Sequence, residues 1–339
     1  MFDTSIPVIQ APMAGVQDSA LTIAVARAGG LGSLACAMLS LEKLREELSK
    51  ITAATNNPYN VNFFCHTPAT PDAVQEQRWR EQLASYYTEF DIDPTDIPTA
   101  GIRSPFSAEA ADVLAEFSPP VVSFHFGLPE PVLLKQVQAM GSKVISSATT
   151  LEEARWLQAN GADAVIAQGV EAGGHRGMFL GEDISTQVGT FALVPQLVAA
   201  LDIPVIAAGG IADASGVRAA LALGACAVQI GTAFLLCPES NASAVHRAAL
   251  KSEAGRTTAL TNVFSGRPAR SIVNRVMREQ GPMSDCAPVF PTACAALGPI
   301  RACAEASGSG DFSSLWAGQN VSGCKEIPAA KLLQELADA

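Results

Sequence analysis

The sequence has little charge, few histidines and no long apolar run, and each shortage removes a class of function. Only 16% of its 339 residues are charged, and the formal net charge is −11. Because nucleic-acid-binding proteins carry basic faces that neutralise phosphates, this balance argues against nucleic acid as a partner. No apolar run reaches the roughly 20 residues that span a bilayer, so no membrane association is expected. The first residues hold no basic stretch and no cleavage site, which predicts no signal peptide and a cytoplasmic protein.

The eight cysteines form no CxxC pair, and only four histidines are scattered among them. A zinc site needs clustered ligands, so the sequence predicts no metal site. Several cysteines lie inside apolar runs, where cysteine behaves as a small hydrophobic residue. We therefore expect reduced thiols that pack rather than react.

What the sequence does contain is a regular alternation of apolar stretches of strand length with stretches of helical periodicity. Hydrophobic residues make up 48% of the chain, enough for a sizeable core. Strands that are apolar on both faces are typical of parallel strands covered by helices. Eight of them in βα alternation predict an α/β fold, a (β/α)8 or TIM barrel. The expected strands are Pro7–Met13, Leu31–Ala37, Val61–Phe64, Val121–Phe126, Lys143–Ala148, Ala164–Gln168, Pro204–Ala208 and Ala227–Ile230.

The alternation is interrupted in two places. An insertion occupies about residues 66–118, and the strand rhythm stops after residue 256. We expect residues 1–256 to form the barrel and residues 257–339 to form a smaller, mainly helical second domain, joined by part of the insertion. Four arginines in this last segment are interpreted as a solvated helix face. They are Arg267, Arg270, Arg275 and Arg278.

Glycines follow the seventh and eighth expected strands. Gly209 and Gly210 end the first of these runs, and Gly231 and Thr232 follow the second. Barrels often bind phosphate at this place, because glycine lets the backbone approach an anion closely. The chain has no GxGxxG or GxxxxGK[ST] motif, which disfavours a Rossmann or P-loop site.

Two histidines lie at expected strand ends. His175 sits among Gly173, Gly174 and Gly177, just beyond the sixth strand, where α/β enzymes carry catalytic residues. His125 ends the fourth strand. Its place in the sequence is compatible with two roles, a hydrogen-bonded core residue or a pocket residue.

Two amides in apolar strands, Asn62 and Gln168, need polar partners, which are either a ligand or a neighbouring backbone group. The small residues that end the first strand, Ala11 and Pro12, followed by Met13, would let a flat ring lie against the backbone.

Six motifs occur together in one order: QAPMAG (10–15), VNFF (61–64), FHFG (124–127), AQGVEAGGHRG (167–177), PVIAAGGI (204–211) and QIGTAFL (229–235). In the identity and order of these motifs the chain resembles the nitronate monooxygenases, and the resemblance covers about residues 6–240. The resemblance implies an FMN-dependent TIM-barrel enzyme, a flavoprotein oxidoreductase. Its substrates would be an alkyl nitronate of the propionate 3-nitronate type and O2, and its products a carbonyl compound and nitrite.

The resemblance also implies roles for individual residues. His175 matches the active-site histidine of the family, and His125 matches a second pocket histidine. The residues expected to hold FMN are Ala11, Pro12, Met13, Asn62, Gln168, Gly173, Gly209, Gly210, Gln229, Gly231 and Thr232. Phe64, Phe126 and Met13 are candidates for a dry wall over the ring.

The resemblance is weaker near the end of the chain. Family members carry tyrosines there that reach the substrate, whereas residues 288–301 of this chain contain none. An FMN-dependent NAD(P)H oxidoreductase, of the enoyl or quinone reductase kind, therefore stays open as an alternative, as does a flavin-binding protein without turnover. A homodimer is the candidate assembly.

Overall fold

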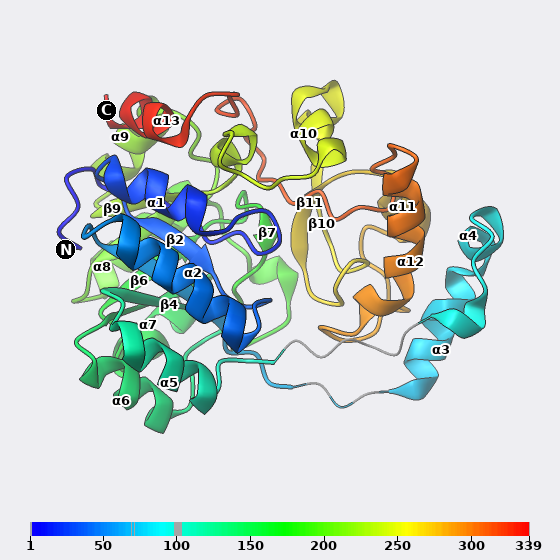
Figure 1. Cartoon of the computed structure of the whole chain (residues 1–339), viewed down its shortest axis with the longest axis horizontal. Helices are drawn as coiled ribbons and strands as arrows, with labels where there is room; N and C mark the ends of the chain where they lie inside the picture. Colours follow the sequence, from blue (N-terminus) through cyan, green and yellow to red (C-terminus); the bar gives the residue numbers. More distant parts are fainter. Residues whose placement is uncertain (1, 69, 71, 98–103, 339) are drawn as a thin grey trace.

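Eight parallel strands form a barrel at the centre of one half of the protein (Figure 1). The computed structural model describes residues 2–68, 70, 72–97 and 104–338. Neighbouring strands pair in the order β1-β9-β8-β6-β5-β4-β3-β2, and a parallel bridge between Ile9 and Leu31 closes the circle. The predicted TIM barrel is confirmed, and all eight expected strands are present. They are β1 (Val8–Gln10), β2 (Gly32–Ala35), β3 (Tyr59–Phe64), β4 (Val121–His125), β5 (Lys143–Ala148), β6 (Ala164–Gln168), β8 (Val205–Ala208) and β9 (Ala227–Ile230).

The barrel strands are buried on both faces. Every residue of β6 and of β8 is buried, because helices cover the outside and side chains from opposite strands fill the inside. Most of the covering helices begin at a side-chain cap. Ser40, Ser107, Thr150 and Asp213 each accept a hydrogen bond from a backbone N–H of the first turn. These helices are α1 (Ser19–Arg27), α2 (Leu41–Ala54), α5 (Ala108–Phe117), α6 (Pro131–Ala139), α7 (Leu151–Ala159), α8 (Thr190–Ala200) and α9 (Ala214–Ala222).

The end of the chain returns to the barrel. Helix α13 (Ala329–Ala337) packs against α1 and α9, and Leu332, Leu333 and Leu336 are buried in the barrel's main apolar cluster (Figure 1). Helix α5 also covers the barrel, beside α2 and α6. The structure therefore differs from the expected boundaries: the barrel includes α5 from the expected insertion and α13 from beyond residue 256. Both helices carry an apolar face that the barrel buries.

A second unit packs over the carboxyl ends of the barrel strands. It holds a three-stranded antiparallel sheet of β10 (Thr258–Thr261), β11 (Ala269–Ile272) and the short β7 (Gly174–His175), which the sequence did not predict. The helices α11 (Arg275–Gln280) and α12 (Ala293–Ala306) complete it, with α10 (Ala244–Lys251) leading into it. None of the helices in the described part of the chain has the length and apolar character that a bilayer span requires.

The insertion after β3 contributes to this second unit. Its helices α3 (Ala73–Gln82) and α4 (Ala84–Glu89) lie beside α12, far from the barrel (Figure 1). Trp79 is fully buried and donates from Nε1 to the Ala293 carbonyl oxygen at 3.2 Å, while Tyr87 donates to the Ala296 carbonyl oxygen at 2.8 Å. Residues 98–103 of the expected insertion lie outside the described residues.

The four arginines of the last segment do not share a solvated helix face. Arg270 lies on β11, is only 5% exposed, and donates from Nε to the Val170 carbonyl oxygen at 2.8 Å. Arg267 precedes β11 and lies 4.3 Å from the centre of the Phe126 ring. Only Arg275 and Arg278 lie on a helix, α11. The expectation was wrong because Arg270 lies on β11, the central strand of the small sheet over the barrel, and Arg267 lies just before this strand.

Candidate active site

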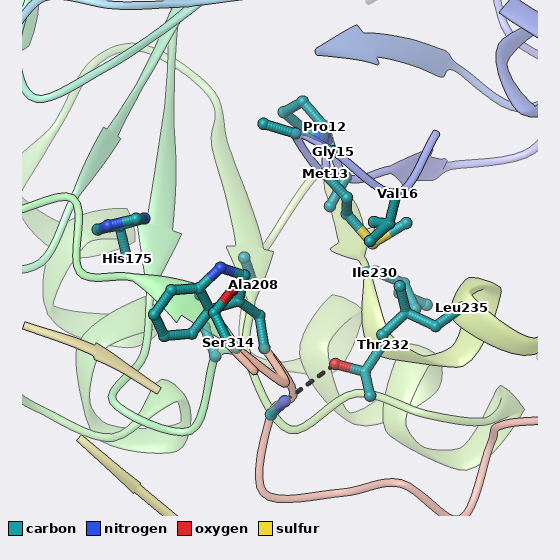
Figure 2. A pocket seen from close by; sticks show the side chains of 18 of the residues that line it. Pro12, Met13, Gly15, Val16, His175, Ala208, Ile230, Thr232, Leu235 and Ser314 are labelled. Atoms are coloured by element: carbon teal, nitrogen blue, oxygen red, sulfur yellow. Dashed lines mark hydrogen bonds between the residues drawn. The ribbon is translucent and has the colours of Figure 1, made fainter. Parts of the chain in front are cut away.

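A cavity of about 480 Å³ opens at the carboxyl ends of the barrel strands, between the barrel and the second unit. This volume lies within the range of ordinary ligand and cofactor sites. Figure 2 shows Pro12 and Met13 beside Ile230 and Thr232 on one side of the cavity, with His175 across from them. Every residue predicted to bind the cofactor or to act in catalysis lines this one cavity.

The barrel end of the cavity is built largely from backbone. Gly209 and Gly210 follow β8 with φ values of 119° and 72°, a region that residues with a side chain rarely adopt. A Cβ on Gly231 would lie 3.3 Å from the Ala11 Cβ and 3.5 Å from the Met13 Sδ. The glycines therefore keep open a cradle where a flat or anionic group can approach the main chain.

A segment near the end of the chain, residues 316–320, closes this cradle; we refer to it as the strap. The Gly318 N–H donates to Thr232 Oγ1 at 3.0 Å, the dashed line in Figure 2, and Asn320 Nδ2 donates to the Gly210 carbonyl oxygen at 3.2 Å. A Cβ on Gly173 would meet the strap backbone at 2.6 Å, so only glycine fits there. The strap was not predicted from the sequence. The only local signal for it is Trp316 followed by the small residues Ala317 and Gly318.

His175 lies on the edge strand β7, paired with β11, and is not on a free glycine loop. Its Nε2 lies 2.8 Å from Ser265 Oγ. The rings of Trp316 and Phe290 lie 5.3 and 5.4 Å from the imidazole, centre to centre. The sheet and these contacts fix the ring in a largely aromatic wall. Phe126 and Phe64 belong to the same wall, with ring centres 6.1 and 6.3 Å from that of His175. Ser265, Phe290 and Trp316 were also missed, because they come from distant segments.

His125 contacts the backbone of the segment that carries His175. Its Nε2 lies 3.2 Å from the His175 carbonyl oxygen, and its Nδ1 lies 3.2 Å from Ser147 Oγ. Burial, the largest cause, and the nearby guanidinium groups of Arg267 and Arg176 together lower the pKa of His125 to about 4, although the hydrogen bond to the His175 backbone acts in the opposite direction. The imidazole is therefore neutral at pH 7, with its proton on Nε2, because a carbonyl oxygen can only accept.

Gln168 and Arg176 hold the same segment from its other side. Gln168 donates from Nε2 to the His175 carbonyl oxygen at 2.9 Å and accepts from the Gly177 N–H at 2.7 Å. Arg176 is fully buried and donates to the Gly169 and Gln168 carbonyl oxygens at 2.7 and 2.6 Å. Burial lowers the pKa of Arg176 to about 10, so the side chain stays charged at neutral pH.

Two amides of the cavity differ in their partners. Asn62 is bonded within the protein, because its Nδ2 donates to Ser123 Oγ at 2.9 Å. Gln229 Oε1, in contrast, is buried without a hydrogen-bond partner among the described residues. An unpartnered buried acceptor at a cavity wall is costly unless a ligand donates to it. Gln229 is therefore the amide of this cavity that points most directly to a bound molecule.

Comparison with known proteins places this site in a family. The family model described as nitronate monooxygenase matches residues 1–338. A nitronate monooxygenase of Pseudomonas aeruginosa is 45% identical over 335 residues, covering 98% of this chain and 95% of the relative. The crystal structure of a nitroalkane oxidase from Streptomyces ansochromogenes superposes with a TM-score of 0.90 at 39% identity, covering 99% and 96% of the two chains. The structure of FabK from Thermotoga maritima superposes with a TM-score of 0.74 at 29% identity, covering 99% of this chain and 93% of FabK. The chain belongs to the nitronate monooxygenase family of flavin-dependent oxidoreductases.

Proposed function

We propose that the protein uses FMN and O2 to oxidise alkyl nitronates to a carbonyl compound and nitrite. The observation that carries the proposal is the pairing, across one cavity, of a glycine cradle with an anchored imidazole, His175. A nitronate is an anion that is already equivalent to a carbanion, so its oxidation needs a donor to hold the negative charge more than it needs a strong base. The family membership and the nitroalkane oxidase neighbour support the same substrate class.

The residues present fit FMN. The open cradle at Gly209, Gly210 and Gly231 suits the phosphate and ribityl chain, and the Gln229 Oε1 atom offers an acceptor for a flavin N–H group. Ala11, Pro12 and Met13 would lie against the ring. When bound, FMN supplies the redox chemistry, accepting electrons from the nitronate and passing them to O2.

The protein's own side chains bind and orient the substrate. A neutral imidazole carries one donor nitrogen and one acceptor nitrogen, so His175 can donate a hydrogen bond to the nitro oxygens or take a proton from a neutral nitroalkane. Phe64, Phe126 and Trp316 exclude water around it, which strengthens that hydrogen bond. His125, neutral and donating to the His175 backbone, acts as a positioning residue in this proposal.

Spectroscopy and rapid mixing test the proposal. The purified protein is expected to show flavin absorption bands, and anaerobic mixing with propionate 3-nitronate is expected to bleach them. Admission of air should then restore the bands with release of nitrite. Bleaching by NADH but not by the nitronate would overturn the proposal in favour of the NAD(P)H oxidoreductase. A yellow protein that neither compound reduces would instead indicate binding without turnover.

A further inference from the structure

A second, smaller cavity of about 40 Å³ lies beside the first, against helix α12. The two cavities share the wall residues Arg301, Ser314 and Trp316, so the smaller one is a side chamber of the larger. Ser265 also lines the chamber, and its Oγ lies 2.8 Å from His175 Nε2. A single hydroxyl group therefore separates the chamber from the imidazole to which the proposed function assigns proton transfer.

The chamber meets the conditions for holding water. Its volume has room for about two or three water molecules, and a water molecule in such a site needs roughly two to four polar partners. Ser265, Ser314 and Arg301 supply polar groups to the wall. Neither Ser314 nor Arg301 forms a side-chain hydrogen bond or an ion pair with any other residue that the structure describes. Their polar atoms can therefore bind water in the chamber.

The chamber reaches from a buried group to the surface of the protein. At its inner end, Ser265 is only 3% exposed and contacts His175. At its outer end, Arg301 is exposed. Gly298, one turn before Arg301 on α12, keeps the passage wide, because a Cβ at this position would meet no atom within 4 Å. Water in the chamber can therefore exchange with the surrounding solvent.

The Ser265 hydroxyl group can pass a proton on, because it can accept and donate at the same time. Its contacts with the N–H and the carbonyl oxygen of Arg267 are long, at 3.4 Å each, so the contact with His175 Nε2 is its shortest. The rings of Trp316 and Phe290 lie 5.3 and 5.4 Å from the imidazole, centre to centre, and limit the approach of water from their sides. Ser265 therefore offers a polar route away from the imidazole.

From these observations we infer that Ser265 and water in the side chamber carry protons from His175 to solvent when the substrate is a neutral nitroalkane. The inference rests on the proposed function and extends it to the neutral form of the substrate. His175 takes a proton from the carbon that bears the nitro group, and the electron pair of the broken C–H bond stays on the resulting nitronate. The imidazolium then releases its Nε2 proton to Ser265 Oγ, and Ser265 gives its own proton to chamber water. A nitronate has already lost this proton, so its oxidation does not need the relay.

The test compares Gly298→Leu, which displaces water from the chamber, with Ala302→Leu, which adds the same side chain to an exposed position of the same helix. The substrates are nitroethane and ethyl nitronate, whose common carbon skeleton makes changes in binding cancel. In weakly buffered solution, Gly298→Leu should lower kcat on nitroethane by about tenfold or more and keep kcat on ethyl nitronate. Added imidazole, which can take the proton directly, should restore part of the loss. An equal ratio of the two rates in the parent and both variants would overturn the inference.

Proton exchange measured without turnover separates this inference from the proposed function. With isotopically labelled histidine, NMR shows the imidazole N–H signals of only four histidines, and His175→Asn identifies the signal of His175. Its exchange with water, measured by saturation transfer, should be about tenfold slower in Gly298→Leu than in the parent and Ala302→Leu, because exchange then requires local opening of the fold. Ser265→Ala should slow it as well, whereas Ser265→Thr, which keeps the hydroxyl group, should not.

Slower exchange in Gly298→Leu would support the relay even if the parent oxidised neither substrate. Equal exchange rates in the parent and Gly298→Leu would overturn the inference, whatever the protein oxidises.

Discussion

The two ends of the main cavity are built in different ways. The barrel end consists of strand termini and the backbone of Gly209, Gly210 and Gly231, all within short sequence motifs. The other end, which we term the cap end, consists of side chains such as His175, Ser265 and Trp316, which come from segments far apart in the chain. A backbone cradle suits a cofactor of fixed shape, whereas a set of side chains can change with the substrate.

The two ends meet at the segment from Gln168 to Gly177. It leaves the barrel at β6 and enters the second unit at β7, where it pairs with β11. Arg176, Gln168 and His125 hold its backbone. If the ends have separate roles, a substitution at one end should leave the property of the other end intact. Loss of a side chain that holds the backbone of this segment, such as Arg176, should affect both ends.

The largest effect is expected from His175→Asn, at the cap end. Loss of a group that holds or transfers a proton should lower kcat/KM for nitronates by about 10²- to 10⁴-fold. FMN content, measured from the absorption spectrum, should stay at the parent level, because His175 lies across the cavity from the cradle. Parental rates at every pH would contradict the role assigned to His175.

Arg176→Met is expected to disturb both ends. The substitution leaves the Gly169 and Gln168 carbonyl oxygens without the buried donor that they share, and removing one member of a buried charged network costs about 3–5 kcal/mol. Urea unfolding should report this loss of stability, together with reduced activity. Arg278→Met, on α11, is the control and should change the free energy of unfolding by less than about 0.5 kcal/mol. Unchanged stability in Arg176→Met would show that the segment is held without this side chain.

The difference between the ends also explains how much the sequence could predict. Strand positions and the barrel-end glycines follow from local patterns of hydrophobicity and turn chemistry, so they were predicted with their residue numbers. The pairing of β7 with β11 and the packing of Trp316 on His175 join residues about 95 to 140 positions apart, and no local pattern encodes such contacts. The glycines around His175 beyond the sixth strand, and then the family resemblance, identified this histidine from the sequence, but its partners required the structure.

Gly209→Ala tests the barrel end alone. At a φ of 119° a Cβ is strained, and it would lie 2.8 Å from Thr190 Oγ1. FMN affinity, measured by flavin fluorescence on titration, should fall about tenfold or more, whereas the saturated enzyme should keep its preference among nitronates. Gly181→Ala is the matched control, because a Cβ there meets nothing within 4 Å. Loss of nitronate preference at saturating FMN would mean that the two ends are not separable.

The smallest effect concerns the strap and is a dependence on pH. His246 is buried, donates from Nε2 to the Trp316 carbonyl oxygen at 3.1 Å, and has its pKa lowered by burial to about 4. The neutral imidazole therefore stabilises the fold above pH 6.5, and this contribution is lost as the pH falls from 6.5 towards 4. His246→Gln keeps an amide donor but does not titrate. Its free energy of unfolding should fall less steeply than the parent's between pH 7 and 4.5, by about 2 kcal/mol in total, in urea titrations at each pH. Parallel curves for the two proteins would mean that the strap is held equally well by a protonated His246, and that acid weakens the fold elsewhere.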